Sequence, residues 1–326
     1  ATTVSITPQQ TEEDYSGDIV ADKNINNTPH EYELVDTVDK MDALISRLMG
    51  EKEICFDTET TGLDANQAGI VGISFSIKPG TASYVPCPEN KSETHEILNK
   101  FSVLFNDPTI TWVGQNIKYD LLILKNHGFE LVGNVFDTML AHYVIEPEGK
   151  RSMDVLSAKY LGYAPVSITE LIGKKGKGQG NMRDVEVEKV KEYAGEDADI
   201  TLQLKQIFEP EMKEKEVEKV FFDVENPLVK VLTEMEFEGV RVDTEFLNEY
   251  SKELEKEAKI AEESVYKIAG VRFNLASPKQ LGEVLFEKLM LDPKAKKTKT
   301  GQYATGEDVL QKLAQILNPR HIISTH

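Results

Sequence analysis

Cysteine is scarce in this chain of 326 residues, which contains only Cys55 and Cys87. Two single cysteines do not have the paired spacing of a cysteine-based metal site. Cys55 lies in an apolar run that we expect to form a buried strand, so we predict reduced thiols rather than a disulfide. This pattern favours a cytoplasmic protein.

Long apolar runs are also absent. Hydrophobic residues make up 40% of the chain, but no run approaches the roughly 20 residues that are needed to cross a membrane. The opening segment ATTVSITPQQTEEDYSGD is polar and lacks the apolar stretch of a secretory signal. We therefore expect no membrane association and, at about 100–200 residues for each domain, roughly two domains.

Positive charge is in deficit, with 37 Lys and Arg against 56 Asp and Glu and a net charge of −19. Nucleic-acid binding ordinarily requires basic side chains, so we predict weak non-specific DNA affinity that falls further with salt. The deficit does not exclude a metal-dependent nuclease. Bound cations supply positive charge there, and a short single strand needs only a local basic rim.

Four acidic residues stand in three segments, FDTETTGLD, GQNIKYD and YAGEDADIT. Asp57 and Glu59 are two apart in an expected strand, which places them on one face. Tyr193 and Asp197 are four apart in an expected helix and therefore share a face. Asp120 falls in the first turn of a helix after the strand TITWVG, where open α/β sheets present ligand groups. Each signal is weak alone, but together they predict one acidic pocket.

Clustered carboxylates repel one another, so such a pocket normally holds divalent cations. Oxygen ligands without His or Cys favour Mg²⁺ or Mn²⁺ over Zn²⁺. Two ions about 3.5–4 Å apart activate a water and stabilise a leaving 3′ oxygen. In our interpretation Asp57 bridges both ions, and Glu59 and Asp197 complete the tighter site. Asp120 holds the second ion mostly through water. Tyr193, with a phenol pKa near about 10, orients the attacking water rather than acting as a base.

Other polar residues receive structural interpretations. Asp137 is expected to cap the helix that follows it, and Asp64 to lie in a turn. Glu196 and Asp199 flank the helical pair but face elsewhere, which predicts solvated side chains. His142 has apolar helical neighbours and is expected to be packed.

The pattern of apolar residues predicts an α/β fold from residue 31 onward. EYELV is typical of an edge strand, and EICFDTE, AGIVGISFSI and ASYVPC form an expected antiparallel meander. TITWVG and a short strand at residues 135–136 alternate with helices, which predicts a mixed five-stranded sheet flanked by helices. We expect a polar tail over residues 1–30, this domain over 31–210, and a mainly helical domain over 211–326.

The segment GKKGKGQG at residues 173–180 lacks the ending of a nucleoside-triphosphate loop. It remains open at this point whether the segment is a surface loop or contacts phosphate.

FDTETTGLD, GQNIKYDLLIL, FDTMLAHYVI and YAGEDADITLQL resemble the DEDD exonuclease motifs, in the subgroup with tyrosine in the third motif. The resemblance is closest to the proofreading domain of the bacterial DNA polymerase I type (family A) and covers roughly residues 31–318. It implies a ribonuclease H-like fold and the catalytic roles given above for the four acids and Tyr193. It also implies that Thr60, Leu63, Gln115 and Asn116 line a pocket for the terminal nucleotide.

The C-terminal region resembles the start of the polymerase domain of that family, including its thumb, in ENPLVKVLTEMEFEGVRVD and FNLASPKQLGEVLFEKL. The resemblance implies that lysines in PKAKKTKTGQ grip primer–template duplex DNA, namely Lys294, Lys296, Lys297 and Lys299. A solvated charge run is the alternative. The palm and fingers that would follow His326 and the 5′-nuclease domain that would precede residue 1 are absent, so we expect a monomeric piece of a larger polymerase that trims DNA without synthesising it.

Three functional hypotheses follow. The first is a 3′→5′ exonuclease acting on single-stranded DNA ends. The second is a ribonuclease D-like enzyme that trims RNA, and the third is an inert DNA-binding module.

Overall fold

The computed structural model describes residues 21–176, 178–298 and 301–316. The chain divides into two compact units, Ala1–Gly239 and Val240–His326. This division comes later than the expected boundary after residue 210, because helix α10 (Asn226–Glu238) packs on helix α4 (Lys118–Asn126) of the first unit. Within the described ranges, no helix is both long and apolar enough to cross a membrane.

A mixed sheet in the order β1-β4-β3-β2-β5-β6 forms the centre of the first unit. Its strands are β1 (Glu31–Leu34), β2 (Glu53–Thr60), β3 (Ile70–Lys78), β4 (Thr81–Pro86), β5 (Thr111–Gly114) and β6 (Asn134–Asp137). β2, β3 and β4 pair antiparallel, which confirms the meander, and β5 and β6 run parallel to β2. The sheet has six strands rather than five because the EYEL run adds an edge strand parallel to β4.

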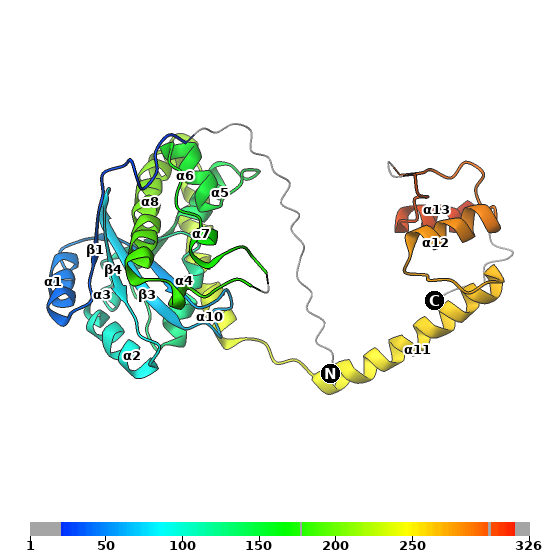
Figure 1. Ribbon diagram of the computed structural model, residues 1–326, viewed down its shortest axis with the longest axis horizontal. Helices are drawn as coiled ribbons and strands as arrows, with labels where there is room; N and C mark the ends of the chain where they lie inside the picture. Colours follow the sequence, from blue (N-terminus) through cyan, green and yellow to red (C-terminus); the bar gives the residue numbers. More distant parts are fainter. Residues whose placement is uncertain (1–20, 177, 299–300, 317–326) are drawn as a thin grey trace. The chain divides into compact units, whose positions relative to one another are not determined.

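Helices cover both faces of the sheet (Figure 1). Four of them share one apolar core, α1 (Val38–Leu48), α2 (Lys91–Lys100), α3 (Ser102–Phe105) and α4. On the other face lie α5 (Thr138–Ile145), α6 (Met153–Leu161) and α8 (Val187–Glu214). Successive residues of β2 alternate between these cores, with Phe56 in the first and Cys55 in the second. Asp57 and Glu59 continue the Cys55 face, so they point toward the layer that contains α8.

Short elements complete this unit, namely α7 (Ile168–Ile172), the 3-10 turn Met182–Asp184, α9 (Glu218–Val220) and the π turn Phe221–Glu225. Three expectations are confirmed. Asp137 caps α5 by accepting hydrogen bonds from the amides of Met139 and Leu140, Asp64 accepts from Asn66 N in a turn, and His142 is fully packed.

Helix α10 uses a different face from the one that its apolar pattern suggests. Its apolar residues Val231 and Met235 are 52% and 62% exposed. The helix is held by Val229, which packs in the core of the sheet domain, and by polar contacts, because Asn226 Nδ2 donates to Val135 O and Lys230 donates to carbonyls just before β6. It therefore belongs to the sheet domain.

Residues 21–30 are part of the fold and not of the expected tail, while residues 1–20 of that tail lie outside the described residues. Lys23 pairs with Tyr163 in a parallel bridge, and Asn24 to Thr28 form a turn. His30 then contacts Glu192 of α8. This segment is anchored immediately before β1.

The second unit is helical, with α11 (Thr244–Ala269), α12 (Pro278–Gly282), the π turn Glu283–Lys288 and α13 (Glu307–Ile316). α12 starts at the Ser-Pro pair, where the Ser277 hydroxyl accepts from Gln280 N. A small core gathers Val284, Phe286 and Leu313, and the rings of Phe286 and Tyr303 lie 5.1 Å apart.

Candidate active site

Strand β2 and helix α8 bring three of the four predicted carboxylates together. Asp57 and Glu59 project from the end of β2, and Asp197 lies on the α8 turn that faces them. One carboxylate oxygen from each of the three lies within 4.8 Å of the others. Two elements that are distant in the sequence thus form one acidic cluster.

Asp120, the fourth predicted acid, is held beside this cluster by Thr58. Its Oδ1 accepts hydrogen bonds from Thr58 N at 3.0 Å and from the Thr58 hydroxyl at 2.5 Å. Strand β5 ends at Gly114 and leaves the Thr58 amide without a strand partner on that side, so the carboxylate of α4 takes that place. The charge of Asp120 contributes to raising the pKa of Asp57 and Glu59, and its bonds to Thr58 place it next to the residue between these two acids. We did not anticipate Thr58, although its position between the two acids of FDTET was a signal.

The electrostatics of the cluster are unfavourable without a cation. Burial first, and then the neighbouring carboxylates, raise the pKa values of Asp57, Glu59 and Asp197 well above their ordinary range. Burial also raises the pKa of Asp120 to about 7, against the lowering effect of the Thr58 hydrogen bonds. A hard divalent cation fits this set of oxygen donors, because it would compensate charges that no nearby lysine or arginine of the described chain pairs.

Tyr193 lies one helical turn before Asp197, on the same side of α8. Burial, followed by the charges of Asp197, Glu59 and Asp57, raises the pKa of the Tyr193 phenol far above 10. The hydroxyl is therefore neutral and available as a donor. This agrees with its interpretation as a positioning group rather than a base.

The predicted nucleotide-pocket residues follow the ends of the neighbouring parallel strands β2 and β5. The Thr60 hydroxyl bonds Tyr119 Oη at 2.6 Å, and Leu63 is 89% exposed on the loop after β2. Gln115 Nε2 donates to Arg151 O at 2.8 Å. Asn116 has a φ of 58°, a left-handed conformation that asparagine tolerates better than most residues.

The turn that carries Gln115 and Asn116 is secured by Asp137. Besides its capping bonds, this carboxylate accepts from Asn116 N at 3.2 Å and Ile117 N at 2.9 Å. One buried acid thus joins the end of β5 to the start of α5. The capping pattern predicted only half of this role.

The expectation that Glu196 and Asp199 are solvated was wrong. Glu196 is fully buried and accepts from Tyr163 Oη at 2.5 Å and Val166 N at 2.7 Å. Asp199 is 4% exposed and accepts from Tyr32 Oη, Gly80 N and Gln203 Nε2. They do face away from the cluster, but toward loops and β1 rather than toward water.

The basic residues lie apart from this cluster in the sequence. The loop at residues 173–180 is exposed over the positions that the structure describes. In the second unit, Lys296 and Lys297 are exposed in a short hairpin, and Lys297 Nζ lies 4.4 Å from the centre of the Tyr303 ring. Lys299 lies outside the described residues.

Comparisons with known proteins match both units. The family model described as 3′-5′ exonuclease matches residues 32–213, and the one described as DNA polymerase family A matches residues 244–325. DNA polymerase I of Pseudomonas aeruginosa is 39% identical over 295 residues, covering 87% of this chain and 32% of that protein. DNA polymerase I of Borreliella burgdorferi is 40% identical over 264 residues, covering 80% of this chain and 28% of that protein.

The chain therefore spans about a third of the length of these curated relatives. Among solved structures, the POL domain of Pol1 from M. smegmatis, in complex with DNA primer-template and dNTP, matches with a TM-score of 0.69. That match is 24% identical and covers 87% of this chain and 45% of the other. At this identity it supports the fold alone.

Proposed function

Since this chain belongs to the 3′-5′ exonuclease family found in family A DNA polymerases, we propose that its first unit hydrolyses the terminal phosphodiester bond of single-stranded DNA 3′ ends. The observation that carries the proposal is the convergence of Asp57, Glu59 and Asp197 within 4.8 Å. Acids so close together, with Glu59 buried and Asp57 and Asp197 half-buried, suit a two-metal hydrolase.

Each carboxylate has an assigned role. Asp57, Glu59 and Asp197 would hold the tighter Mg²⁺ or Mn²⁺ ion, and Asp57 would also serve a second ion. Asp120 would support that second ion through water, and Thr58 fixes the orientation of its carboxylate by two hydrogen bonds. When bound, the ions lower the pKa of an attacking water and stabilise charge on the leaving 3′ oxygen.

Tyr193 directs the attacking water. Its phenol stays protonated, because burial and three nearby carboxylates raise its pKa. A neutral hydroxyl beside Asp197 donates or accepts a hydrogen bond without taking a proton away. It therefore restricts where the water sits, which contributes through orientation rather than through general-base catalysis.

The terminal nucleotide is bound beside the cluster. Thr60 and the exposed Leu63 lie on the β2 side, while Gln115 and Asn116 lie on the β5 side. An exposed leucine is suited to contact a base, and polar groups at the strand ends are suited to the sugar and phosphate. The Asp137 bonds to the 114–117 turn keep the polar side of this pocket rigid.

The second unit binds primer–template duplex in this proposal. Its match to the polymerase family and the exposed Lys296 and Lys297 support this role. The phosphate backbone is the expected contact, so binding should weaken steeply with salt.

A digestion assay tests the proposed activity. A 5′-labelled single strand is incubated with the chain and Mg²⁺ or Mn²⁺, and we expect a ladder of products shortened from the 3′ end. Asp57→Ala should slow trimming by about 10³-fold or more, while Asp39→Asn, which changes an exposed acid on α1, should trim like the parent. Equal trimming by Asp57→Ala refutes the assignment.

A matched RNA strand separates the DNA enzyme from the ribonuclease D-like alternative. Faster trimming of RNA would favour that alternative. If neither strand is trimmed and millimolar Mn²⁺ does not bind, the inert module is favoured.

A further inference from the structure

Helix α8 carries a second polar face beside the catalytic one. Residues 192, 196, 199 and 203 recur at helical spacing and lie on one side of the helix, whereas Tyr193 and Asp197 lie about 100° around it. The members of the second face make buried or half-buried polar contacts with three other segments. Whatever fixes this face also fixes the rotation of the catalytic face.

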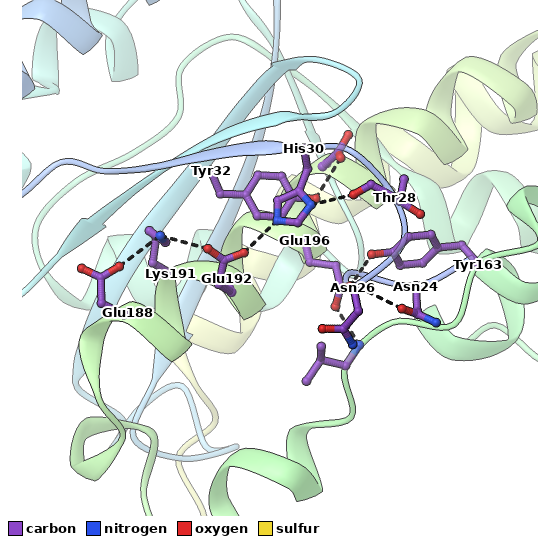
Figure 2. A network of polar contacts seen from close by, with 12 residues as sticks. Asn24, Asn26, Thr28, His30, Tyr32, Tyr163, Glu188, Lys191, Glu192 and Glu196 are labelled. Atoms are coloured by element: carbon purple, nitrogen blue, oxygen red, sulfur yellow. Dashed lines mark hydrogen bonds and ion pairs between the residues drawn. The ribbon is translucent and has the colours of Figure 1, made fainter. Parts of the chain in front are cut away.

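His30 makes the outermost of these contacts (Figure 2). Its Nε2 lies 2.9 Å from Glu192 Oε2, and its Nδ1 lies 2.9 Å from Thr28 O. Glu192 also pairs with Lys191 at 2.9 Å, so its carboxylate is ionised and can only accept. The Thr28 carbonyl can also only accept. Both ring nitrogens must therefore donate, which makes His30 a doubly protonated imidazolium.

Tyr32 docks directly onto the same helix. A Cβ on Gly195 would lie 2.8 Å from Tyr32 Cγ, so only glycine permits this approach. The Tyr32 hydroxyl donates to Asp199 at 3.0 Å, and its ring lies 4.4 Å from the imidazole of His30. A glycine within a helix ordinarily destabilises it relative to alanine. Here that residue allows β1 to contact the α8 backbone between the two catalytic residues.

We propose that His30, held as an imidazolium, and Tyr32 are positioning residues that set the rotation of α8 and thereby align Tyr193 and Asp197. The proposal rests on the proposed exonuclease function. His30 and Tyr193 also line one cavity of about 520 Å³. The contacts of His30 and Tyr32 with α8, called the clamp from here on, therefore lie next to the tyrosine that directs the water. A rotation of α8 by roughly 10° would move a side-chain tip by roughly 1 Å, given a helix diameter of about 10–12 Å, and a misplacement of that size can cost about 10²-fold in rate.

Several charged and titratable groups near His30 influence the pKa of its imidazole. Glu192 faces it directly, and the charge of Glu196 also favours the cation. Asp199 and Tyr32 lie next along the same face, and Lys191 opposes the cation but is itself paired with Glu188 and Glu192. Burial of the ring lowers the pKa of His30, but the Thr28 carbonyl and the acids Glu192 and Glu196 together outweigh it, so this pKa is raised above its ordinary value. The clamp should weaken at alkaline pH.

The kinetic test compares the parent with His30→Gln, Tyr32→Phe and the control His95→Gln, an exposed histidine on α2. We expect His30→Gln to lower kcat about tenfold at neutral pH, with KM changed less than twofold. The ratio of parent to variant kcat should fall toward one as pH rises, because the parent then loses its own cation. A ratio that stays at one, or the same pH-dependent ratio for His95→Gln, overturns the positioning role.

Two measurements do not depend on nuclease activity. By NMR, the imidazole of His30 should titrate above about 6.5 in the parent and at lower pH in Glu192→Gln, which keeps the shape of the partner but not its charge. The amide signals of Tyr193 and Asp197 should shift in His30→Gln without substrate. Titration below the ordinary histidine value, or unchanged amide signals, overturns the proposal even if the parent trims DNA normally. Failure of the parent to trim, with both NMR results as expected, refutes only the exonuclease function.

Discussion

Helix α8 presents buried acids on two faces, and the surrounding protein treats them in opposite ways. Glu196 and Asp199 accept hydrogen bonds from hydroxyl, amide and backbone donors. Asp197, only one or two residues away, faces Asp57 and Glu59, whose charges lie close to its own carboxylate. The acids Glu196 and Asp199 find their hydrogen-bond donors within the protein, whereas the face that carries Asp197 has a deficit of positive charge.

The difference separates structural acids from functional ones more reliably than burial does. Burial raises the pKa of acids on both faces. Donors then lower it for Glu196 and Asp199, whereas further carboxylates raise it for Asp197. Like charges as the nearest neighbours raise the pKa of an acid, and a cation from solution would relieve that repulsion.

The largest expected effect comes from neutralising the catalytic face. Asp197→Asn keeps the shape of the side chain but removes one of three converging anions. We expect trimming to slow by about 10³-fold or more. In metal-free buffer, the free energy of unfolding should rise by about 1 kcal/mol, because like-charge repulsion is relieved. Trimming assays and urea denaturation with a chelator measure both quantities. A marked loss of stability would show that Asp197 is a structural acid.

On the face that carries Glu196 and Asp199, we expect a substitution to lower the free energy of unfolding rather than to raise it. Glu196→Ala leaves the Tyr163 hydroxyl and the Val166 amide without their acceptor, so we predict a loss of about 2–4 kcal/mol in unfolding free energy. Glu188→Ala is the matched control on the same helix, since that side chain is 65% exposed and paired only with Lys191. It should cost less than about 1 kcal/mol. Equal effects of the two substitutions would contradict the distinction between the faces.

Metal ions should stabilise the protein through one face only. Mg²⁺ or Mn²⁺ at about ten times its Kd should add about 1.4 kcal/mol to the unfolding free energy. Asp197→Asn should abolish most of that gain, while Glu188→Ala should retain it. Thermal melts with and without the ion measure the difference. Equal stabilisation of both variants would place the bound ion elsewhere.

The sequence predicted the convergence of Asp57, Glu59 and Asp197 because its signals are local. Strand alternation relates Asp57 to Glu59, and helical spacing relates Tyr193 to Asp197. The resemblance to known exonucleases then related the separate segments to one another. The support of Asp120 by Thr58 was less accessible, because it depends on β5 ending four residues early relative to β2.

Glu196 and Asp199 were wrongly predicted to be solvated because the donors that they bind are distant in the sequence. Nothing near Glu196 indicates that Tyr163 and Val166 will reach it, so an acid on a helix was taken as solvated. Gly195 was a usable signal, since a glycine in mid-helix often marks a close approach, here by Tyr32. The anchoring of residues 21–30 was hidden for a similar reason, because a polar segment without periodicity gives no sign of a contact with α8.

The smallest expected effect concerns the cation on the face that carries Glu196 and Asp199. His30 provides a positive charge from within the protein, whereas the acids of the catalytic face would need a cation from solution. Its pKa is raised in the folded state by Thr28, Glu192 and Glu196, against the lowering effect of burial. A raised folded pKa means that its contribution to stability is fully present below about pH 6.5, the ordinary histidine value, and is lost as pH rises through the folded pKa. The difference in unfolding free energy between the parent and His30→Gln should therefore shrink between about pH 6 and pH 9. The change should stay within about 1 kcal/mol, since the ion pair is partly exposed. Urea denaturation at both pH values, with His95→Gln as control, measures it. A difference that does not vary with pH would mean that His30 is neutral in the folded chain, and that the catalytic face alone depends on a cation.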